Sequence, residues 1–280
     1  MTMVTEKGLD FSTSRPLPAQ IKADGYKFVN RYLSWEPNTK VLNYAEAHSY
    51  LIRGIDIHLN WEFDAHDGAG GAAKGRVHAI EAVRQARALG YGPHRTIYFS
   101  TGDFDVIGEG KVSVCDSYIR AASDYVRNTE YRMGEYSGFH YLDHLWGTGL
   151  IDDGWQSPSK FGHPGWRWDS RNHIHQTQLG VNYHGSQVDI NEKVGPTYSW
   201  LSPWTPPIIN NGDEESGMGF FIQEAGQSAI YFTNGLVARH VADMTDFNRL
   251  QFAIRKAGYY AEIETVPLGS VAKGSYGRVM

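Results

Sequence analysis

The sequence predicts an α/β fold, namely a modified TIM barrel with about five βα units, β-rich closing strands and a small C-terminal α+β module. Three observations lead to this prediction. Strand-like and helix-like segments alternate along residues 8–146, helix-like segments fade after that, and four strand-like segments end in carboxylates. A chain of 280 residues has room for a barrel of about 200 residues or more with an appendage.

The individual elements follow apolar periodicity and the residues that interrupt it. Ile55, Ile57, Leu59 and Trp61, for example, alternate with polar residues, which indicates a strand. The strands of the βα units are expected at residues 8–11, 27–33, 54–61, 96–100 and 131–136. Their helices are expected at residues 19–23, 41–52, 77–89, 112–126 and 140–146. Three closing strands, joined by loops alone, are expected at residues 154–156, 173–177 and 187–190.

A glycine-rich segment, residues 67–73, precedes the third of these helices. It lacks the G-x-G-x-x-G and G-x-x-x-x-G-K-[ST] patterns of phosphate-binding loops. A mobile rim loop over a cleft is therefore favoured over nucleotide binding.

Three prolines and a polar acidic run mark residues 200–216 as a linker. This places the barrel in residues 1–199 and a small α+β module in residues 217–280. Within the module, strands are expected at residues 220–223, 228–232, 236–241 and 260–266, and a helix at residues 245–256. Self-association through this module is one expectation.

Composition excludes several function classes. The net charge of −5 gives no electrostatic basis for nucleic-acid binding, and no apolar run approaches the roughly 18 residues of a membrane-spanning helix, so neither partner is expected. Cys115 is the only cysteine, so no intramolecular disulfide can form, and a buried hydrophobe is favoured over a nucleophile. The N-terminal residues lack an apolar signal region, so cytoplasmic synthesis is expected.

The strand-end carboxylates are the candidate catalytic residues. They are Asp10, Glu62, Asp103, Asp105 and Asp189. In a parallel βα barrel such strand ends meet at one rim, where these barrels carry their chemistry. Carboxylates gathered beside aromatic side chains favour acid/base work on a sugar polymer.

Each carboxylate has a functional and a structural interpretation. Glu62, beside Trp61, is the candidate general acid, and a rim salt bridge is its alternative. Asp10 and Asp189 would orient substrate or stabilise charge; alternatively they form a structural pair with Arg31 or backbone amides. If the strand extends to them, Asp103 and Asp105 point the same way and one assists water or polarises an N-acetyl group; alternatively Gly102 breaks the strand and Asp103 caps the turn.

Further side chains at strand ends are candidates for contact with sugar. They are Arg31, Tyr32, Asp64, Tyr136, Trp155, Gln156 and Gln176. Aromatic residues at strand ends also serve as core, which is the alternative for each. The histidine pairs His140 with His144 and His173 with His175 lack a cysteine partner or an HExxH motif, so no metal is expected.

Several motifs occur along the chain in a recognisable order. They are Gly8-Leu9-Asp10-Phe11-Ser12, Asn60-Trp61-Glu62-Phe63-Asp64, Ile97-Tyr98-Phe99-Ser100 with Asp103-Phe104-Asp105, Trp155-Gln156, His175-Gln176 and Val188-Asp189-Ile190-Asn191. Together they resemble the glycoside-hydrolase-like barrel domains of actinobacteria and their phages, relatives of the family-25 lysozymes, over about residues 8–195.

The resemblance implies a barrel without a cofactor that hydrolyses the peptidoglycan glycan strand between N-acetylmuramic acid and N-acetylglucosamine, as phage endolysins do. Asp103-Phe104-Asp105 departs from the Asp-x-Glu pair that family-25 lysozymes usually carry. The leading hypothesis is a bacteriolytic muramidase made in the host cytoplasm and released to the cell wall. Residues 1–199 would then be its catalytic barrel, and residues 217–280 would serve wall binding or oligomerisation. The alternatives are a non-catalytic glycan-binding or virion tail component, and a hydrolase of another wall polysaccharide.

Overall fold

The computed structural model describes residues 5–35 and 39–201 with their side chains, and beyond them the backbone of five short strands. The chain divides into two compact units, residues 1–86 with 93–203 and residues 87–92 with 204–280. Among the described residues, no helix is both long and apolar enough to cross a bilayer.

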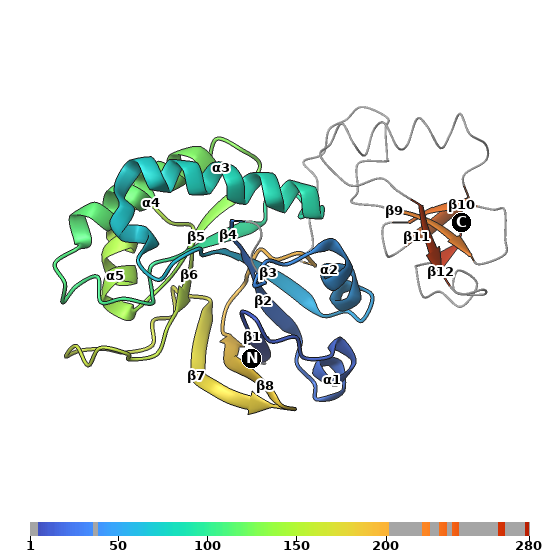
Figure 1. The fold of residues 1–280 in the computed structure, drawn as a ribbon, viewed down its shortest axis with the longest axis horizontal. Coiled ribbons are helices and arrows are strands. Elements are labelled where there is room, and N and C mark those ends of the chain that lie inside the picture. The colour runs from blue at the N-terminus through green and yellow to red at the C-terminus, as the bar shows by residue number, and fades with distance from the viewer. Residues whose placement is uncertain are drawn as a thin grey trace. The chain divides into compact units, whose positions relative to one another are not determined.

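The first unit is a closed barrel of eight strands (Figure 1). The strands are β1 (Glu6–Asp10), β2 (Phe28–Leu33), β3 (Asp56–Trp61), β4 (Thr96–Ser100), β5 (Arg132–Ser137), β6 (Asp153–Gln156), β7 (Ile174–Tyr183) and β8 (Ser186–Lys193). Five α-helices connect the first six strands: α1 (Pro18–Ala23), α2 (Tyr44–Leu51), α3 (Gly71–Leu89), α4 (Val112–Val126) and α5 (Phe139–Thr148). No described helix lies between β6, β7 and β8, so the predicted barrel with β-rich closing strands is confirmed.

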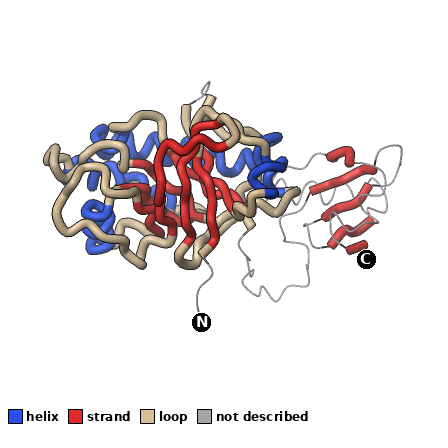
Figure 2. The backbone as a smooth tube through the Cα atoms, turned by 90° about the horizontal axis from the view of Figure 1, so that it is seen from below, coloured by secondary structure: helices blue, strands red, loops and turns tan. Residues whose placement is uncertain are grey.

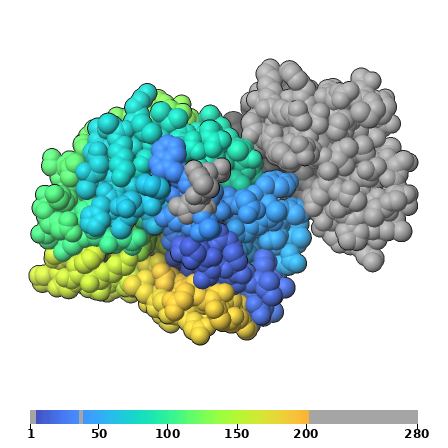
Figure 3. Space-filling view, viewed as in Figure 1, coloured from blue at the N-terminus to red at the C-terminus, as the bar shows by residue number. Residues whose placement is uncertain are grey.

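The direction of β8 determines how the barrel closes. Neighbouring strands from β1 to β7 pair in parallel, whereas β8 is antiparallel to both β7 and β1. The β1–β8 pairing brings the two ends of the barrel sequence side by side, as the adjoining dark blue and orange surfaces in Figure 3 show. From below, the strands face the viewer and the helices lie behind and beside them (Figure 2). The carboxyl ends of β1–β7 therefore share one rim, and β8 reaches that rim with its beginning.

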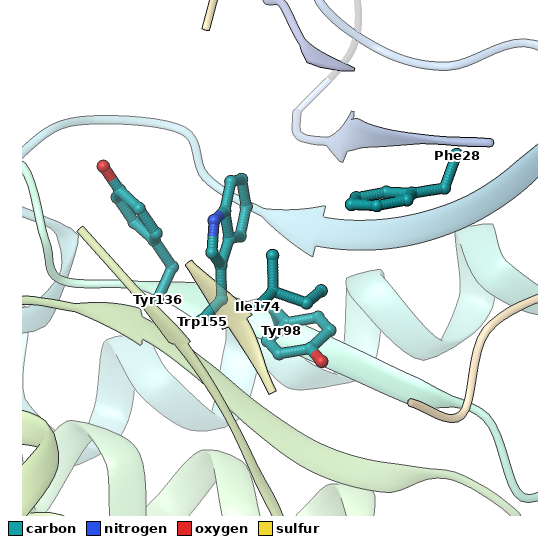
Figure 4. Close-up of a cluster of buried hydrophobic side chains, with 5 residues drawn as sticks. All are labelled: Phe28, Tyr98, Tyr136, Trp155 and Ile174. Carbon is teal, nitrogen blue, oxygen red and sulfur yellow. The ribbon is translucent and has the colours of Figure 1, made fainter. Parts of the chain in front are cut away.

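The barrel interior is packed with large side chains. Phe28, Tyr98, Tyr136, Trp155 and Ile174 form one buried cluster (Figure 4). Because β2 and β7 are not neighbours in the sheet, Phe28 and Ile174 can join one cluster only across the interior. Figure 4 shows Tyr136 at one end of the cluster with its hydroxyl pointing away from the other side chains. A packed interior of this kind leaves the rim as the place for a site.

The glycine-rich segment is not the mobile rim loop that the sequence predicted. It forms the 3-10 helix η1 (Asp67–Gly70) and the first turn of α3, and Asp67 and Gly68 are buried. A Cβ atom added to Gly68 would lie 2.7 Å from Cγ2 of Thr101, so this glycine allows close packing against the end of β4. Glycines here provide close approach, which an isolated sequence does not distinguish from flexibility.

A carboxyl group is buried between the barrel and its helices. Glu135 on β5 is 0% exposed, and its Oε1 accepts hydrogen bonds from the amide of Thr101, at 3.1 Å, and from the Thr101 hydroxyl. Its Oε2 has no hydrogen-bond partner among the described residues. Burial raises the pKa of Glu135 well above its ordinary value, against the two Thr101 hydrogen bonds. The ionised form of the carboxyl group is therefore disfavoured, and the group ties the end of β4 to β5.

The second unit contains a five-stranded sheet in the order β12-β9-β10-β11-β13. Its strands are β9 (Phe220–Glu224), β10 (Ile230–Thr233), β11 (Val237–His240), β12 (Ile263–Val266) and β13 (Arg278–Val279). The first four overlap the strands expected from the sequence, and β13 was not expected. The expected helix at residues 245–256 and most of the expected linker lie outside the described residues. At the start of that linker, Trp200 is 4% exposed and its amide donates to the carbonyl of Ile57.

Two glycines in helices predict opposite effects of alanine. A Cβ atom added to Gly75 in α3 would lie 2.2 Å from the backbone carbonyl oxygen of Tyr118 in α4, whereas one added to Gly147 in α5 meets nothing within 4 Å. We expect Gly75→Ala to lower the free energy of unfolding by about 1–3 kcal/mol through overpacking. The matched control, Gly147→Ala, should raise it by up to about 1 kcal/mol. Urea unfolding measures both, and equal effects would contradict the close α3–α4 packing.

Glu135→Gln tests the neutral buried carboxyl group. A group whose pKa is raised by folding destabilises the folded state as pH rises above its unfolded pKa, because ionisation favours the unfolded chain. The wild type should therefore lose stability relative to Glu135→Gln from about pH 4.5 upward, by as much as about 1.4 kcal/mol per pH unit. Urea midpoints of both proteins from pH 4 to pH 8 measure this difference. Parallel curves would show that Glu135 is ionised in the folded protein.

Candidate active site

Four of the five predicted catalytic carboxylates lie together at the rim. Asp10 ends β1, Glu62 follows β3, Asp103 follows β4, and Asp189 lies near the beginning of β8. They also lie close enough for their charges to affect one another. Asp189 acts on the pKa of Asp10, and Asp103 acts on the pKa values of both Glu62 and Asp189.

Asp10 lies at the floor of this group and is 2% exposed. Its Oδ1 is 3.3 Å from the hydroxyl of Tyr32, and its Oδ2 accepts from Nε2 of Gln176 at 3.1 Å and from Nδ2 of Asn191. Burial, followed by the charge of Asp189, raises the pKa of Asp10 to about 7 against these hydrogen bonds. Near neutral pH this carboxyl group is therefore poised to gain or release a proton.

Asp189 is the register partner of Asp10 across the β1–β8 ladder. Its Oδ2 accepts from the same Gln176 Nε2 at 3.0 Å, and its Oδ1 accepts from the amide of Gly180 at 2.7 Å. Burial raises the pKa of Asp189, with help from Asp103, although the Gly180 amide and Lys160 act against the shift. One glutamine amide thus bridges two acids whose ionised forms are both disfavoured.

Glu62 is the first residue after β3, and its amide continues the sheet by donating to the carbonyl of Leu33 at 3.0 Å. Its side chain is 14% exposed and forms an ion pair with Lys40, with 2.8 Å between Oε1 and Nζ. Burial and then the charge of Asp103 raise the pKa of Glu62, and Lys40 opposes this shift. The rim salt bridge weighed in the sequence analysis therefore exists, and the pKa of Glu62 is raised in spite of it.

Asp103 and Asp105 do not lie on an extended strand. β4 ends at Ser100, and Gly102 and Asp103 form a turn before Asp105. Asp103 pairs with Lys160, at 2.8 Å, within the rim group.

Asp105 instead accepts from Nε2 of His163 at 2.7 Å and from the amide of Gly108 at 2.8 Å. Burial acts to raise the pKa of Asp105, but these hydrogen bonds outweigh it and lower the pKa. The carboxylates that act on the pKa of Tyr136 are those of the rim group, and Asp105 is not among them. The strand does not extend to Asp103 and Asp105, because β4 already ends at Ser100, so the condition for the two side chains to point the same way is not met.

Three of the residues expected to contact sugar lie within this rim group. Tyr32 and Gln176 bond to Asp10 as described. The hydroxyl of Tyr136 donates to Oε1 of Gln176 at 2.7 Å and accepts from Nζ of Lys160 at 2.7 Å. A continuous hydrogen-bonded chain thus runs from Lys160 through Tyr136 and Gln176 to Asp10 and Asp189.

The four other residues expected to contact sugar make contacts within the protein fold instead. The guanidinium of Arg31 is 0% exposed and bonds to Glu46 and to the carbonyls of Phe11 and Lys40, so it anchors loops and does not pair with Asp10. Trp155 is 1% exposed in the barrel core, and its Nε1 donates to Asn191.

The amide of Gln156 is buried and holds the loop between β6 and β7 through the carbonyl of Arg167 and the amide of Asp169. Asp64 is exposed, and its carboxylate accepts from the amide of His66 in a local turn. Trp155 and Gln156 lie at the end of β6, whereas Arg31 lies within β2 and Asp64 lies beyond the end of β3. All four side chains face a loop, the core or solvent.

Sequence reasoning missed Lys40, Lys160 and Asn191. The two lysines lie on loops, without a strand pattern to mark them: Lys40 in the loop after β2 and Lys160 in the loop after β6. Asn191 was visible as part of the Val188-Asp189-Ile190-Asn191 motif, two residues after Asp189 and therefore on the same face of β8. No group of three or more histidine, cysteine, aspartate or glutamate side chains able to hold a metal ion occurs in the described part of the chain.

Comparisons with known proteins identify the barrel. The family described as "Rv2525c-like, glycoside hydrolase-like domain" matches residues 19–194. The chain is similar in structure to the Tat-secreted protein Rv2525c of Mycobacterium tuberculosis, with 23% identity, a TM-score of 0.62, and coverage of 70% of this chain and 98% of that one.

An uncharacterised protein of B. stearothermophilus shows 21% identity and a TM-score of 0.51, covering 66% of this chain and 94% of that one. A bacterial lysozyme from Streptomyces coelicolor has 14% identity and a TM-score of 0.47, covering 69% and 94%. No curated protein sequence matches the chain. The two likenesses with TM-scores above 0.5 establish the fold, and the family match spans more than half of the sequence, so the chain belongs to the Rv2525c-like family of glycoside hydrolase-like domains.

Proposed function

We propose that this protein hydrolyses glycan strands of the bacterial cell wall by carboxylate acid/base catalysis, with peptidoglycan as its substrate. The observation that carries the proposal is the rim group of four carboxylates, in which burial and mutual repulsion raise the pKa values of Asp10, Glu62 and Asp189. Raised carboxyl pKa values are what a proton donor to a glycosidic oxygen requires. The glycoside hydrolase-like family supports the same chemistry, and an endolysin-type role belongs to the same proposal.

Glu62 is the proton donor in this proposal. Its side chain is more accessible than that of Asp10, and its raised pKa favours the protonated form. Asp103, paired with Lys160, provides negative charge that stabilises the oxocarbenium-like transition state. Asp10 and Asp189, bridged by Gln176, form the floor of the site and accept or return a proton as the charge of the rim changes.

One observation favours a second function, a non-catalytic glycan-binding component. Glu62 and Asp103 are each paired with a lysine, and an ion-paired carboxylate is a poor proton donor. In that case the polar rim would bind sugar hydroxyl groups without cleaving the chain. Fold alone does not separate binding from catalysis, so turnover is the deciding measurement.

Release of reducing ends from purified actinobacterial peptidoglycan tests the proposal, with mass spectrometry of the products. The wild type should release muramic-acid reducing ends, and Glu62→Gln should lower the rate at least about 100-fold, because the proton donor is lost. The matched control is Asp124→Asn, an exposed carboxylate of α4, which should retain the wild-type rate. Wall binding without release by any of the three proteins would reject the hydrolase and support the glycan-binding component.

Lys40→Met predicts a shift in the pH dependence. Removing the ammonium group 2.8 Å from Glu62 disfavours the ionised carboxylate and so raises the pKa of Glu62 further. A general acid acts in its protonated form, so the rate falls as pH rises through its pKa. The alkaline limb of the rate profile should therefore move to higher pH in Lys40→Met. An unchanged alkaline limb would mean that Glu62 is not the proton donor.

A further inference from the structure

A carboxylate outside the rim group binds the backbone of the segment that carries Glu62. Asp67 in η1 is 0% exposed. Its Oδ2 accepts hydrogen bonds from the amides of Phe63, at 2.8 Å, and Asp64, at 3.1 Å. These are the two residues that follow Glu62, so one buried side chain holds the chain immediately beyond the proposed proton donor.

The position of this contact matters because the sheet ends there. The amide of Glu62 still donates to β2, through the carbonyl of Leu33 at 3.0 Å. The next two amides have passed the end of β3 and donate to Asp67 in place of a strand. Asp67 thus provides the hydrogen-bond acceptor for the two amides that follow the sheet. The backbone of Glu62 is therefore held on one side by the sheet and on the other by the carboxylate of Asp67.

Asp67 is itself held from the opposite side. Its Oδ1 forms an ion pair with Nζ of Lys74 in α3, at 2.9 Å. Nδ1 of His78, one turn further along α3, lies 3.8 Å from Oδ2 of Asp67 and 2.9 Å from the hydroxyl of Tyr118 in α4. The ring of His78 also packs on Trp61, with 5.0 Å between centroids.

The turn that contains Asp67 is closely packed against its neighbours. Gly68 packs against Thr101 and against Sγ of Cys115, where an added Cβ atom would lie 2.7 Å and 3.2 Å from the nearest atoms of each. Cys115 is buried in α4, and burial raises its pKa to about 12, so it packs as a neutral thiol. The support for Asp67 therefore consists of α3, α4 and the end of β4.

We infer that Asp67 is a positioning residue for Glu62: its carboxylate fixes the backbone of Phe63 and Asp64 and thereby holds the Glu62 side chain against Lys40 and near Asp103. Its contribution to turnover rests on the proposed hydrolase function, whereas its effect on the Glu62 side chain does not. Without the carboxylate, two amides lose their acceptor and the segment after β3 is free to carry Glu62 toward solvent.

The titration of the Glu62 carboxyl carbon, followed by NMR in the full chain, tests the inference without requiring activity. Burial and Asp103 raise the pKa of Glu62 in the wild type. In Asp67→Ala this pKa should fall toward its ordinary value, because the side chain becomes more hydrated. Asp67→Asn keeps an acceptor oxygen and should give a smaller shift in the same direction. Asp124→Asn on the exposed face of α4 is the matched control and should leave the titration unchanged.

Turnover gives a second measurement. A displaced proton donor lowers kcat, on the order of 10–100-fold, with little change in KM, because substrate binding involves the rest of the rim. An unchanged Glu62 titration in folded Asp67→Asn and Asp67→Ala would overturn the inference. A shifted titration in proteins that never release sugar, the wild type included, would uphold the positioning role and reject the hydrolase. If Asp67→Ala does not fold, Asp67→Asn alone decides.

Discussion

The antiparallel ladder between β1 and β8 is the constraint on which the candidate site depends. Parallel strands deliver their carboxyl ends to the rim, whereas β8 arrives there by its beginning. Closure in this manner sets Asp189 opposite Asp10, so two acids become neighbours as a direct result of topology. Gln176, from the adjacent strand, is then within reach of both and separates them with one amide group.

Gathering four carboxylates at one partly buried rim is electrostatically unfavourable. The structure offsets the repulsion between them in two ways. Glu62 and Asp103 each pair with a lysine from a loop, Lys40 and Lys160. Asp10 and Asp189 receive hydrogen bonds from neutral amides, which leave their ionisation disfavoured. Burial still disfavours the ionised form of Glu62 despite its lysine, so three of the four carboxyl groups are suited to hold a proton.

The fold and the positions of the strand-end carboxylates were predictable from the sequence because both depend on local periodicity and on the order of the strands. What the sequence could not supply were contacts made by loops. Lys40 and Lys160 meet their carboxylates only through tertiary folding. The different surroundings of Asp103 and Asp105 depend on where β4 ends. The sequence around Gly102 was compatible both with a strand that continues to Asp105 and with one that stops earlier. Arg31 looked like a partner for Asp10, yet its guanidinium faces Glu46 on the outside of the barrel.

The amide bridge also decides where a proton on Asp10 can lie. Oδ2 of Asp10 already accepts from Gln176 and Asn191, so the proton must lie on Oδ1, which faces the hydroxyl of Tyr32. A phenol can accept a hydrogen bond as well as donate one. Protonation of Asp10 therefore reverses the direction of the bond to Tyr32 and turns the phenolic hydrogen toward another acceptor. The protonation state of Asp10, beneath the site, therefore decides whether the half-buried Tyr32 hydroxyl above it donates or accepts a hydrogen bond.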